Sequence, residues 1–155
     1  MKYKIIDKSH SEDIAALAVC LMNEIIERTE SKHFKVDVPL AFSLCENYIS
    51  NGLYHIMAAF DDDRVIGFGA ICESRSLYAK GVFGIIQEFY IMPRYRSKGV
   101  GKSLIDEIIK YSKARGWKRL ELSTPPVPEF DRTVEFYQSN GFEITGGYKM
   151  KYVIA

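Results

Sequence analysis

A short run of basic and glycine residues has the composition of an anion-binding turn. It reads Arg96-Ser97-Lys98-Gly99-Val100-Gly101-Lys102-Ser103, follows the apolar segment Phe89–Pro93, and precedes an amphipathic stretch that begins at Leu104. A strand that leads through glycines into a helix leaves free backbone N–H groups at the helix start, where the helix dipole also attracts negative charge. Three basic side chains add positive charge, so the pattern predicts a phosphate site.

Two nucleotide-binding motifs resemble this turn, and each fails at one required glycine. The P-loop pattern GxxxxGK[ST] needs a glycine five residues before Gly101, where the chain has Arg96. The dinucleotide pattern GxGxxG needs a third glycine where Leu104 stands. The P-loop also requires a later apolar strand that ends in aspartate, and the dinucleotide motif requires an acidic residue after the next strand. Both are missing, so a nucleotide is not the predicted ligand.

Two motifs together resemble those of a known family. The apolar strand, Pro93 and Arg96-x-x-Gly99-x-Gly101 are similar to the acetyl-CoA-binding motif [RQ]-x-x-G-x-[GA] of the GNAT superfamily of N-acetyltransferases. The segment Thr133–Phe142 resembles that family's late helix with its FY…GF ending. The order of the expected elements also agrees over nearly the full length of the chain.

The resemblance implies an enzyme that uses acetyl-CoA. No metal is expected, because the three histidines show no spacing typical of a metal site. It would move the acetyl group to a primary amine of a small molecule or a protein by direct attack in a ternary complex. A non-catalytic acyl-CoA sensor or partner subunit is the alternative. In the family, the CoA pyrophosphate lies on the turn and the pantetheine arm pairs with the central strand. The implied cofactor-binding residues are Phe89, Tyr90, Ile91, Arg96, Ser97, Lys98, Gly99, Val100, Gly101 and Lys102. A solvated basic turn is the other interpretation of the charged side chains.

Acetyl transfer to an amine needs a base, because deprotonating an alkylamine at pH 7 costs about 4–5 kcal/mol. Glu88 is the candidate, since it is the only carboxylate within the apolar strand Val82–Met92, and a charge in a buried strand is costly unless it is paired or functional. Period-2 alternation puts Glu88 on the face of Ile86 and Tyr90, opposite Gln87, Phe89 and Ile91. The resemblance also implies that a bulge in this strand would change that assignment. Glu73 and Tyr90 are reserve candidates, and a solvent-facing or paired carboxylate is the non-catalytic interpretation.

Tyr137 is the candidate acid for the departing thiolate, whose ordinary pKa is about 8.5. It resembles the tyrosine of the family's FY pair, although a packed aromatic is the alternative. A backbone N–H near Ile91 would stabilise the oxyanion. Asp131 and Thr133 stand where relatives often carry Asn and Ala, so Asp131 is interpreted as a helix N-cap.

The pattern of apolar and turn residues along the chain predicts an α/β fold. Its sheet would be mixed and mostly antiparallel, with about six to seven strands, and about four helices would flank it. The expected order is β-α-α-β-β-β-α-β-α-β-β. A capping box of Ser9 and Glu12 predicts the start of the first helix. The expected strands are Lys2–Asp7, Tyr54–Phe60, Val65–Cys72, Val82–Met92, Trp117–Ser123, Phe142–Ile144 and Tyr148–Ile154. The expected helices run from Ser9 to about Arg28, from Pro39 to Ser50, from the turn to Arg115, and from Asp131 to Ser139.

The length of 155 residues fits one N-acetyltransferase domain over residues 1–155. A net charge of +1 favours neither nucleic acid nor an anionic membrane as a partner. The three cysteines form no CxxC pair, which suits the reducing cytoplasm. Apolar residues in the expected edge strand Tyr148–Ile154 would allow a homodimer, which is common in the family.

Overall fold

The computed structural model describes residues 1–30 and 36–154. The chain divides into two compact units, Met1–Leu122 and Ser123–Ala155. The single domain over residues 1–155 therefore stays a prediction. Within the described ranges, no helix is both long enough and apolar enough to cross a membrane.

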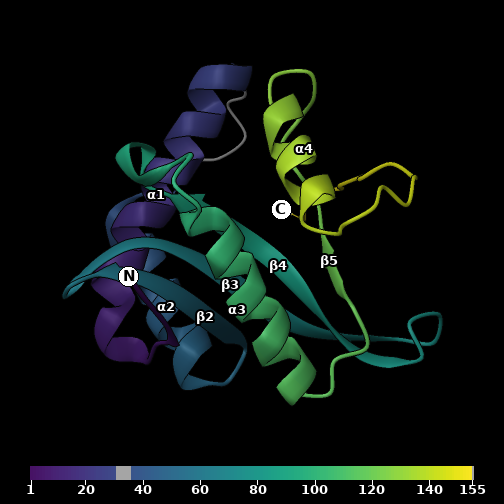
Figure 1. Ribbon diagram of the computed structural model, residues 1–155, viewed down its shortest axis with the longest axis horizontal. Helices are drawn as coiled ribbons and strands as arrows, with labels where there is room; N and C mark the ends of the chain where they lie inside the picture. Colours follow the sequence, from purple (N-terminus) through teal and green to yellow (C-terminus); the bar gives the residue numbers. More distant parts are fainter. Residues whose placement is uncertain (31–35, 155) are drawn as a thin grey trace. The chain divides into compact units, whose positions relative to one another are not determined.

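The first unit is built on a mixed sheet, as predicted. Its strands are β1 (Lys2–Ile5), β2 (Tyr54–Asp61), β3 (Arg64–Ser76), β4 (Gly81–Ile91) and β5 (Leu120–Leu122). They lie in the order β1-β2-β3-β4-β5; the first four pair antiparallel and β5 pairs parallel to β4. A parallel pair needs a crossover connection, and helix α3 (Val100–Ala114) supplies it (Figure 1).

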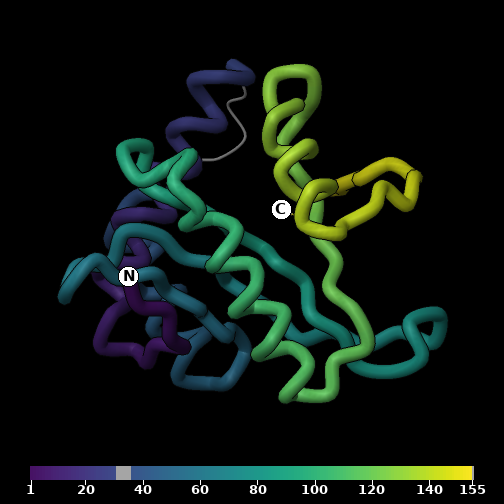
Figure 2. The backbone as a smooth tube through the Cα atoms, in the orientation of Figure 1, coloured from purple at the N-terminus to yellow at the C-terminus, as the bar shows by residue number. Residues whose placement is uncertain are grey.

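Helices cover both faces of this sheet. Helices α1 (Ser11–Thr29) and α2 (Val38–Ser50) pack on one face, where Ile14, Cys45 and Phe68 belong to one buried cluster. Helix α3 crosses the other face, as the backbone trace in Figure 2 shows. There Ile108 is fully buried over Gly69, where an added Cβ would lie 2.6 Å from the Ile108 Cδ1 atom. The glycine thus permits the close approach of α3 to β3.

The helix starts differ in detail from the sequence prediction. The proposed capping box is wrong, because the Ser9 hydroxyl donates to the Asp7 carboxylate and a short 3-10 helix (Lys8–His10) precedes α1. The start of α2 was predicted within one residue: Pro39 lies in its first turn, and Asp37 caps it by accepting a hydrogen bond from the Leu40 amide.

The second unit contains helix α4 (Asp131–Ser139). Asp131 is the first residue of this helix rather than its N-cap, which is Phe130. The two predicted final strands are absent among the described residues, so the sheet has five strands rather than six or seven. A strand is held by pairing with a neighbour, and residues 142–154 enter no strand ladder of the structure. Gly146 and Gly147, with φ of 88° and 82°, turn the chain between the two segments.

Candidate active site

The predicted anion-binding turn begins where β4 ends. A short 3-10 helix, Pro93–Tyr95, leads into the turn, and α3 begins at Val100. Gly99 is the N-cap with a left-handed φ of 83° and makes no side-chain cap hydrogen bond. The Ser103 amide donates the first intrahelical hydrogen bond, to the Gly99 carbonyl at 3.0 Å. The amides of residues 100–102 therefore point out of the helix end, which is the geometry that binds anions.

Ser97 contributes to the same arrangement. Its φ of 61° is left-handed, a conformation that costs about 1–2 kcal/mol for a residue with a Cβ. Left-handed residues alternating with other conformations turn successive N–H groups toward one point, which is a feature of phosphate loops. The backbone of the turn thus supports the anion site independently of its side chains.

The Arg96 side chain is engaged within the protein rather than directed at the turn. Its Nε donates to the Ile91 carbonyl at 2.8 Å, and its two terminal nitrogens lie 2.8 and 3.2 Å from the Glu24 carboxylate oxygens. The guanidinium also lies 5.2 Å from the centroid of the Tyr90 ring. Arg96 therefore ties the turn to α1 and β4, and Glu24 offsets its charge. Lys98 is exposed, and the Lys102 ammonium lies 2.8 Å from Asp106.

The parallel ladder between β4 and β5 is short. The partners between β4 and β5 are Gly84↔Leu120, Ile85↔Glu121 and Ile86↔Leu122, and the ladder ends there although β4 continues to Ile91. The register between β3 and β4 also shifts at this point, because Ile71 pairs with Ile86 whereas Ala70 pairs with Glu88. Gln87 is thus the extra residue of a β-bulge in β4.

The bulge decides which face Glu88 occupies. Ala70 and Ile71 are successive residues of β3 and point to opposite faces, so their partners Glu88 and Ile86 do too. The period-2 prediction was therefore wrong for Ile86, although Glu88 and Tyr90 share a face as expected. Glu88 faces the side covered by α1 and α2.

Glu88 is half-buried, and one tyrosine hydroxyl binds it. The Tyr54 hydroxyl lies 3.1 Å from each carboxylate oxygen and donates to them. Burial raises the pKa of the Glu88 carboxyl, and the hydrogen bond from Tyr54 lowers it in part. Burial and the neighbouring Glu88 raise the pKa of the Tyr54 hydroxyl, which stays protonated. Sequence reasoning missed Tyr54, because only the strand register brings it to Glu88.

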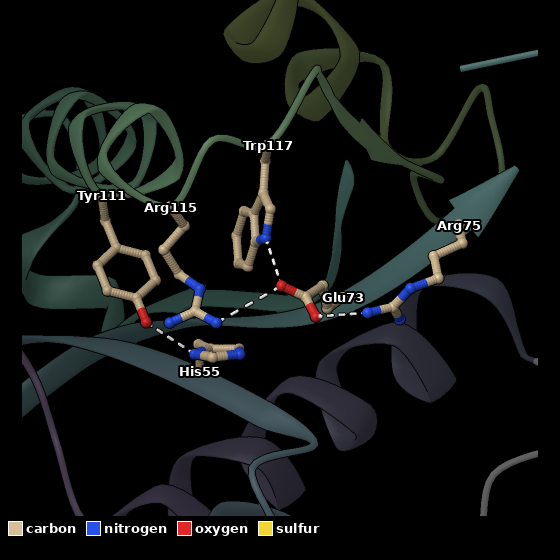
Figure 3. A network of polar contacts seen from close by, with 6 residues as sticks. All are labelled: His55, Glu73, Arg75, Tyr111, Arg115 and Trp117. Carbon is tan, nitrogen blue, oxygen red and sulfur yellow. Dashed lines mark hydrogen bonds and ion pairs between the residues drawn. The ribbon is translucent and has the colours of Figure 1, made fainter. Parts of the chain in front are cut away.

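The reserve base Glu73 lies on the opposite face in a different network (Figure 3). The indole N–H of Trp117 donates to Glu73 at 2.7 Å, and Arg115 and Arg75 lie 3.5 Å away. The Trp117 hydrogen bond, together with Arg115, lowers the pKa of Glu73, so it is a weaker base than an ordinary glutamate. His55 Nδ1 lies 2.7 Å from the Tyr111 hydroxyl, and burial lowers the pKa of its imidazole.

Tyr137 lies in α4 of the second unit. Its ring centroid is 5.2 Å from that of Phe136 and 5.5 Å from that of Phe142, both in edge-to-face geometry. The side chain is buried, which raises the pKa of the phenol. The hydroxyl therefore stays protonated near neutral pH.

Residues 21–142 match the model of the acetyltransferase (GNAT) family. Two similar proteins are uncharacterized N-acetyltransferases. The protein from Bacillus subtilis is 29% identical over 86 residues, which cover 56% of this chain and 54% of that protein. The protein from Methanocaldococcus jannaschii is 35% identical over 79 residues, which cover 50% of this chain and 34% of that protein. The chain therefore spans about half or less of the length of the curated relatives it matches.

Solved structures share the fold over nearly the whole chain. A ribosomal-protein-alanine N-acetyltransferase from Brucella melitensis biovar Abortus has a TM-score of 0.72 at 18% identity. The alignment covers 97% of this chain and 98% of that enzyme. An aminoglycoside N-acetyltransferase in complex with CoA has a TM-score of 0.77 at 18% identity. The alignment covers 99% of this chain and 95% of that enzyme. At such identity, the likeness establishes the fold.

Proposed function

The chain belongs to the acetyltransferase (GNAT) family, and we propose that it is an acetyl-CoA-dependent N-acetyltransferase. It would transfer the acetyl group to a primary amine of a small molecule or a protein by direct attack in a ternary complex. The observation that carries this proposal is the turn after β4, where Gly99 opens α3 in a left-handed conformation without a side-chain cap. Such a helix start suits a pyrophosphate.

The cofactor would extend from this turn along β4. Its pyrophosphate binds the backbone from Ser97 to Lys102, and the pantetheine arm lies along Phe89–Ile91. The early end of the β4–β5 ladder supports this path, because the pairing with β5 stops at Ile86. Arg96 would act by holding the turn in place, since Glu24 and the Ile91 carbonyl engage its guanidinium. The reaction as proposed uses no metal.

The oxyanion would form near the end of β4. The Ile91 carbonyl accepts from Arg96, whereas the Met92 amide donates to Ile66 of β3. Within a strand, the N–H and C=O of one residue point to the same edge. The Ile91 N–H therefore points away from β3, which supports it as the donor to the tetrahedral intermediate.

Two side chains would move the protons. Glu88 takes the proton of the attacking amine, directly or through water, as the nitrogen bonds to the thioester carbonyl carbon. When the tetrahedral intermediate collapses, the C–S bond breaks and the electron pair leaves on sulfur. Tyr137 then gives its hydroxyl proton to the thiolate. Solvent returns a proton to the Tyr137 phenolate and removes the proton from Glu88. The products are the acetylated amine and free CoA.

The acceptor is tested by thiol release from acetyl-CoA across a panel of amines. The panel contains an aminoglycoside, a polyamine, a lysine peptide and a peptide with N-terminal alanine, since two neighbours in fold are named for acceptors of the first and last kinds. We expect release above the hydrolysis background with at least one class. Tight acetyl-CoA binding without turnover on any amine would instead support the non-catalytic sensor or partner subunit.

The Gly99→Ala variant tests the cofactor site. The left-handed φ of 83° at Gly99 disfavours a Cβ, so we expect acetyl-CoA to bind about tenfold more weakly by calorimetry. The matched control is Gly116→Ala at the other end of α3, where φ is 75° and the surrounding space is equally open. That variant should lose similar thermal stability and bind acetyl-CoA normally. Equal affinities in the two variants would contradict a cofactor site at the turn.

The remaining expectations concern location and partners. We propose that the reaction takes place in the cytoplasm, with neither nucleic acid nor membrane as a partner, in a single domain over residues 1–155. A homodimer stays a prediction, and it would involve the segment Tyr148–Ile154, where Tyr148 and Met150 are highly exposed.

A further inference from the structure

The contact between Tyr54 and Glu88 spans the sheet across β3. Tyr54 pairs with Cys72 of β3, and Glu88 pairs with Ala70 of the same strand. Residues two apart on one strand point to the same face, so the tyrosine and the carboxylate both face α1 and α2. Because Ala70 and Cys72 are small, the phenol can lie over β3 and reach β4. The ring of Tyr48 in α2 supports it, with a centroid separation of 5.0 Å.

We infer that Tyr54 is the positioning residue of the proposed reaction, because its hydroxyl holds the Glu88 carboxylate in place as the base. This inference rests on the role proposed for Glu88. The hydroxyl lies at the same distance, 3.1 Å, from both carboxylate oxygens. Among the described residues, none of the ion pairs of the structure involves Glu88. The tyrosine is thus the polar side chain that orients this carboxylate.

The hydrogen bond also opposes the effect of burial. Burial raises the pKa of the Glu88 carboxyl, and the donated hydrogen bond favours the charged form that a base needs. Other titratable groups lie near this pair. The Cys45 thiol of α2 interacts with Glu88, and the Tyr48 and Cys72 side chains interact with Tyr54. The Arg96–Glu24 ion pair and Cys20 of α1 interact with Tyr90 of β4. Removing the Tyr54 hydroxyl would therefore leave the carboxyl protonated at a higher pH.

The Tyr54→Phe variant tests this inference, because it keeps the ring and removes only the hydroxyl. We expect the acid limb of the kcat–pH profile to move upward by about one pH unit. We expect plateau kcat to fall about tenfold as the carboxylate loses its fixed orientation, with acetyl-CoA affinity unchanged. The wild type and the variant are measured with the same acceptor, so the titration of the amine is common to both.

The matched control is Tyr111→Phe, which removes a part-buried hydroxyl bonded to His55 on the opposite face. It should lower thermal stability to a similar degree and leave the pH profile unchanged. If both variants show the same profile as the wild type, Tyr54 contributes only to stability and the inference is overturned.

A direct titration separates this inference from the proposed function. The Glu88 carboxyl is followed by carbon NMR on glutamate-labelled protein, with the Glu88→Gln variant to assign the signal. An unchanged Glu88 midpoint in Tyr54→Phe overturns the inference. A raised midpoint together with a shifted profile supports it. A raised Glu88 midpoint with an unshifted kcat–pH profile overturns the positioning role. If Glu88→Gln is then also fully active, the proposed base itself was wrong.

Discussion

Replacing Glu88 by glutamine should lower kcat by about 10²–10⁴-fold, the range typical of a lost general base. Glutamine keeps the size of the side chain and its hydrogen bond to Tyr54 but cannot accept the proton of the amine. Calorimetric binding of acetyl-CoA should stay within a factor of two or so, because the cofactor is proposed to bind the backbone of β4 and the turn. Steady-state thiol release with the acceptor identified from the panel measures the effect.

The pH dependence of the wild type gives a second measure of the same residue. A base works only when it is deprotonated, and burial raises the pKa of Glu88. The kcat of the wild type should therefore fall on the acid side, at a pH above the ordinary glutamate value of about 4.3. This acid limb should disappear in Glu88→Gln.

A carboxylate on the other face of the sheet provides the control. Glu73→Gln alters a residue that is bonded to Trp117 and Arg115, so it should reduce thermal stability and leave kcat close to the wild-type value. Wild-type turnover in Glu88→Gln would instead mean that a water chain leads the proton to another group.

The Tyr137→Phe variant should lower kcat on the order of 10²-fold, with little change in acetyl-CoA affinity. The phenol is expected to protonate the departing CoA thiolate, a step that occurs after the cofactor has bound. Phenylalanine keeps the edge-to-face contacts with Phe136 and Phe142, so the helix should stay folded. Turnover and calorimetric affinity, measured on the same preparation, separate the two effects.

Tyr148→Phe is the matched control for this variant, because Tyr148 belongs to the same unit and is almost fully exposed. It should behave as the wild type in both measurements. Unchanged turnover in Tyr137→Phe would remove the tyrosine from the mechanism and leave it as a packed aromatic of α4.

Local backbone preferences made much of the fold predictable. Pro39 suits a first helical turn, and Gly99 tolerates the left-handed conformation at the start of α3. The continuous apolar run of residues 82–92 is typical of a central strand, and it forms β4 between β3 and β5. Such signals act between residues close in the sequence, so they can be interpreted without the tertiary structure. The prediction of the two final strands, Phe142–Ile144 and Tyr148–Ile154, was wrong, because a strand forms by pairing with a neighbour and not through composition alone.

The turn after β4 and the order of the helices and strands from β1 to α4 were thus determined by the sequence alone, since glycine, proline and charge act there through the local backbone. The tertiary structure decided the surroundings of the reacting groups. The bulge at Gln87 set the face of Glu88, the register across β3 brought Tyr54 to it, and α1 supplied Glu24 as the partner of Arg96. These contacts join residues far apart in the chain, and a one-residue change of register reverses the face of every later side chain in a strand.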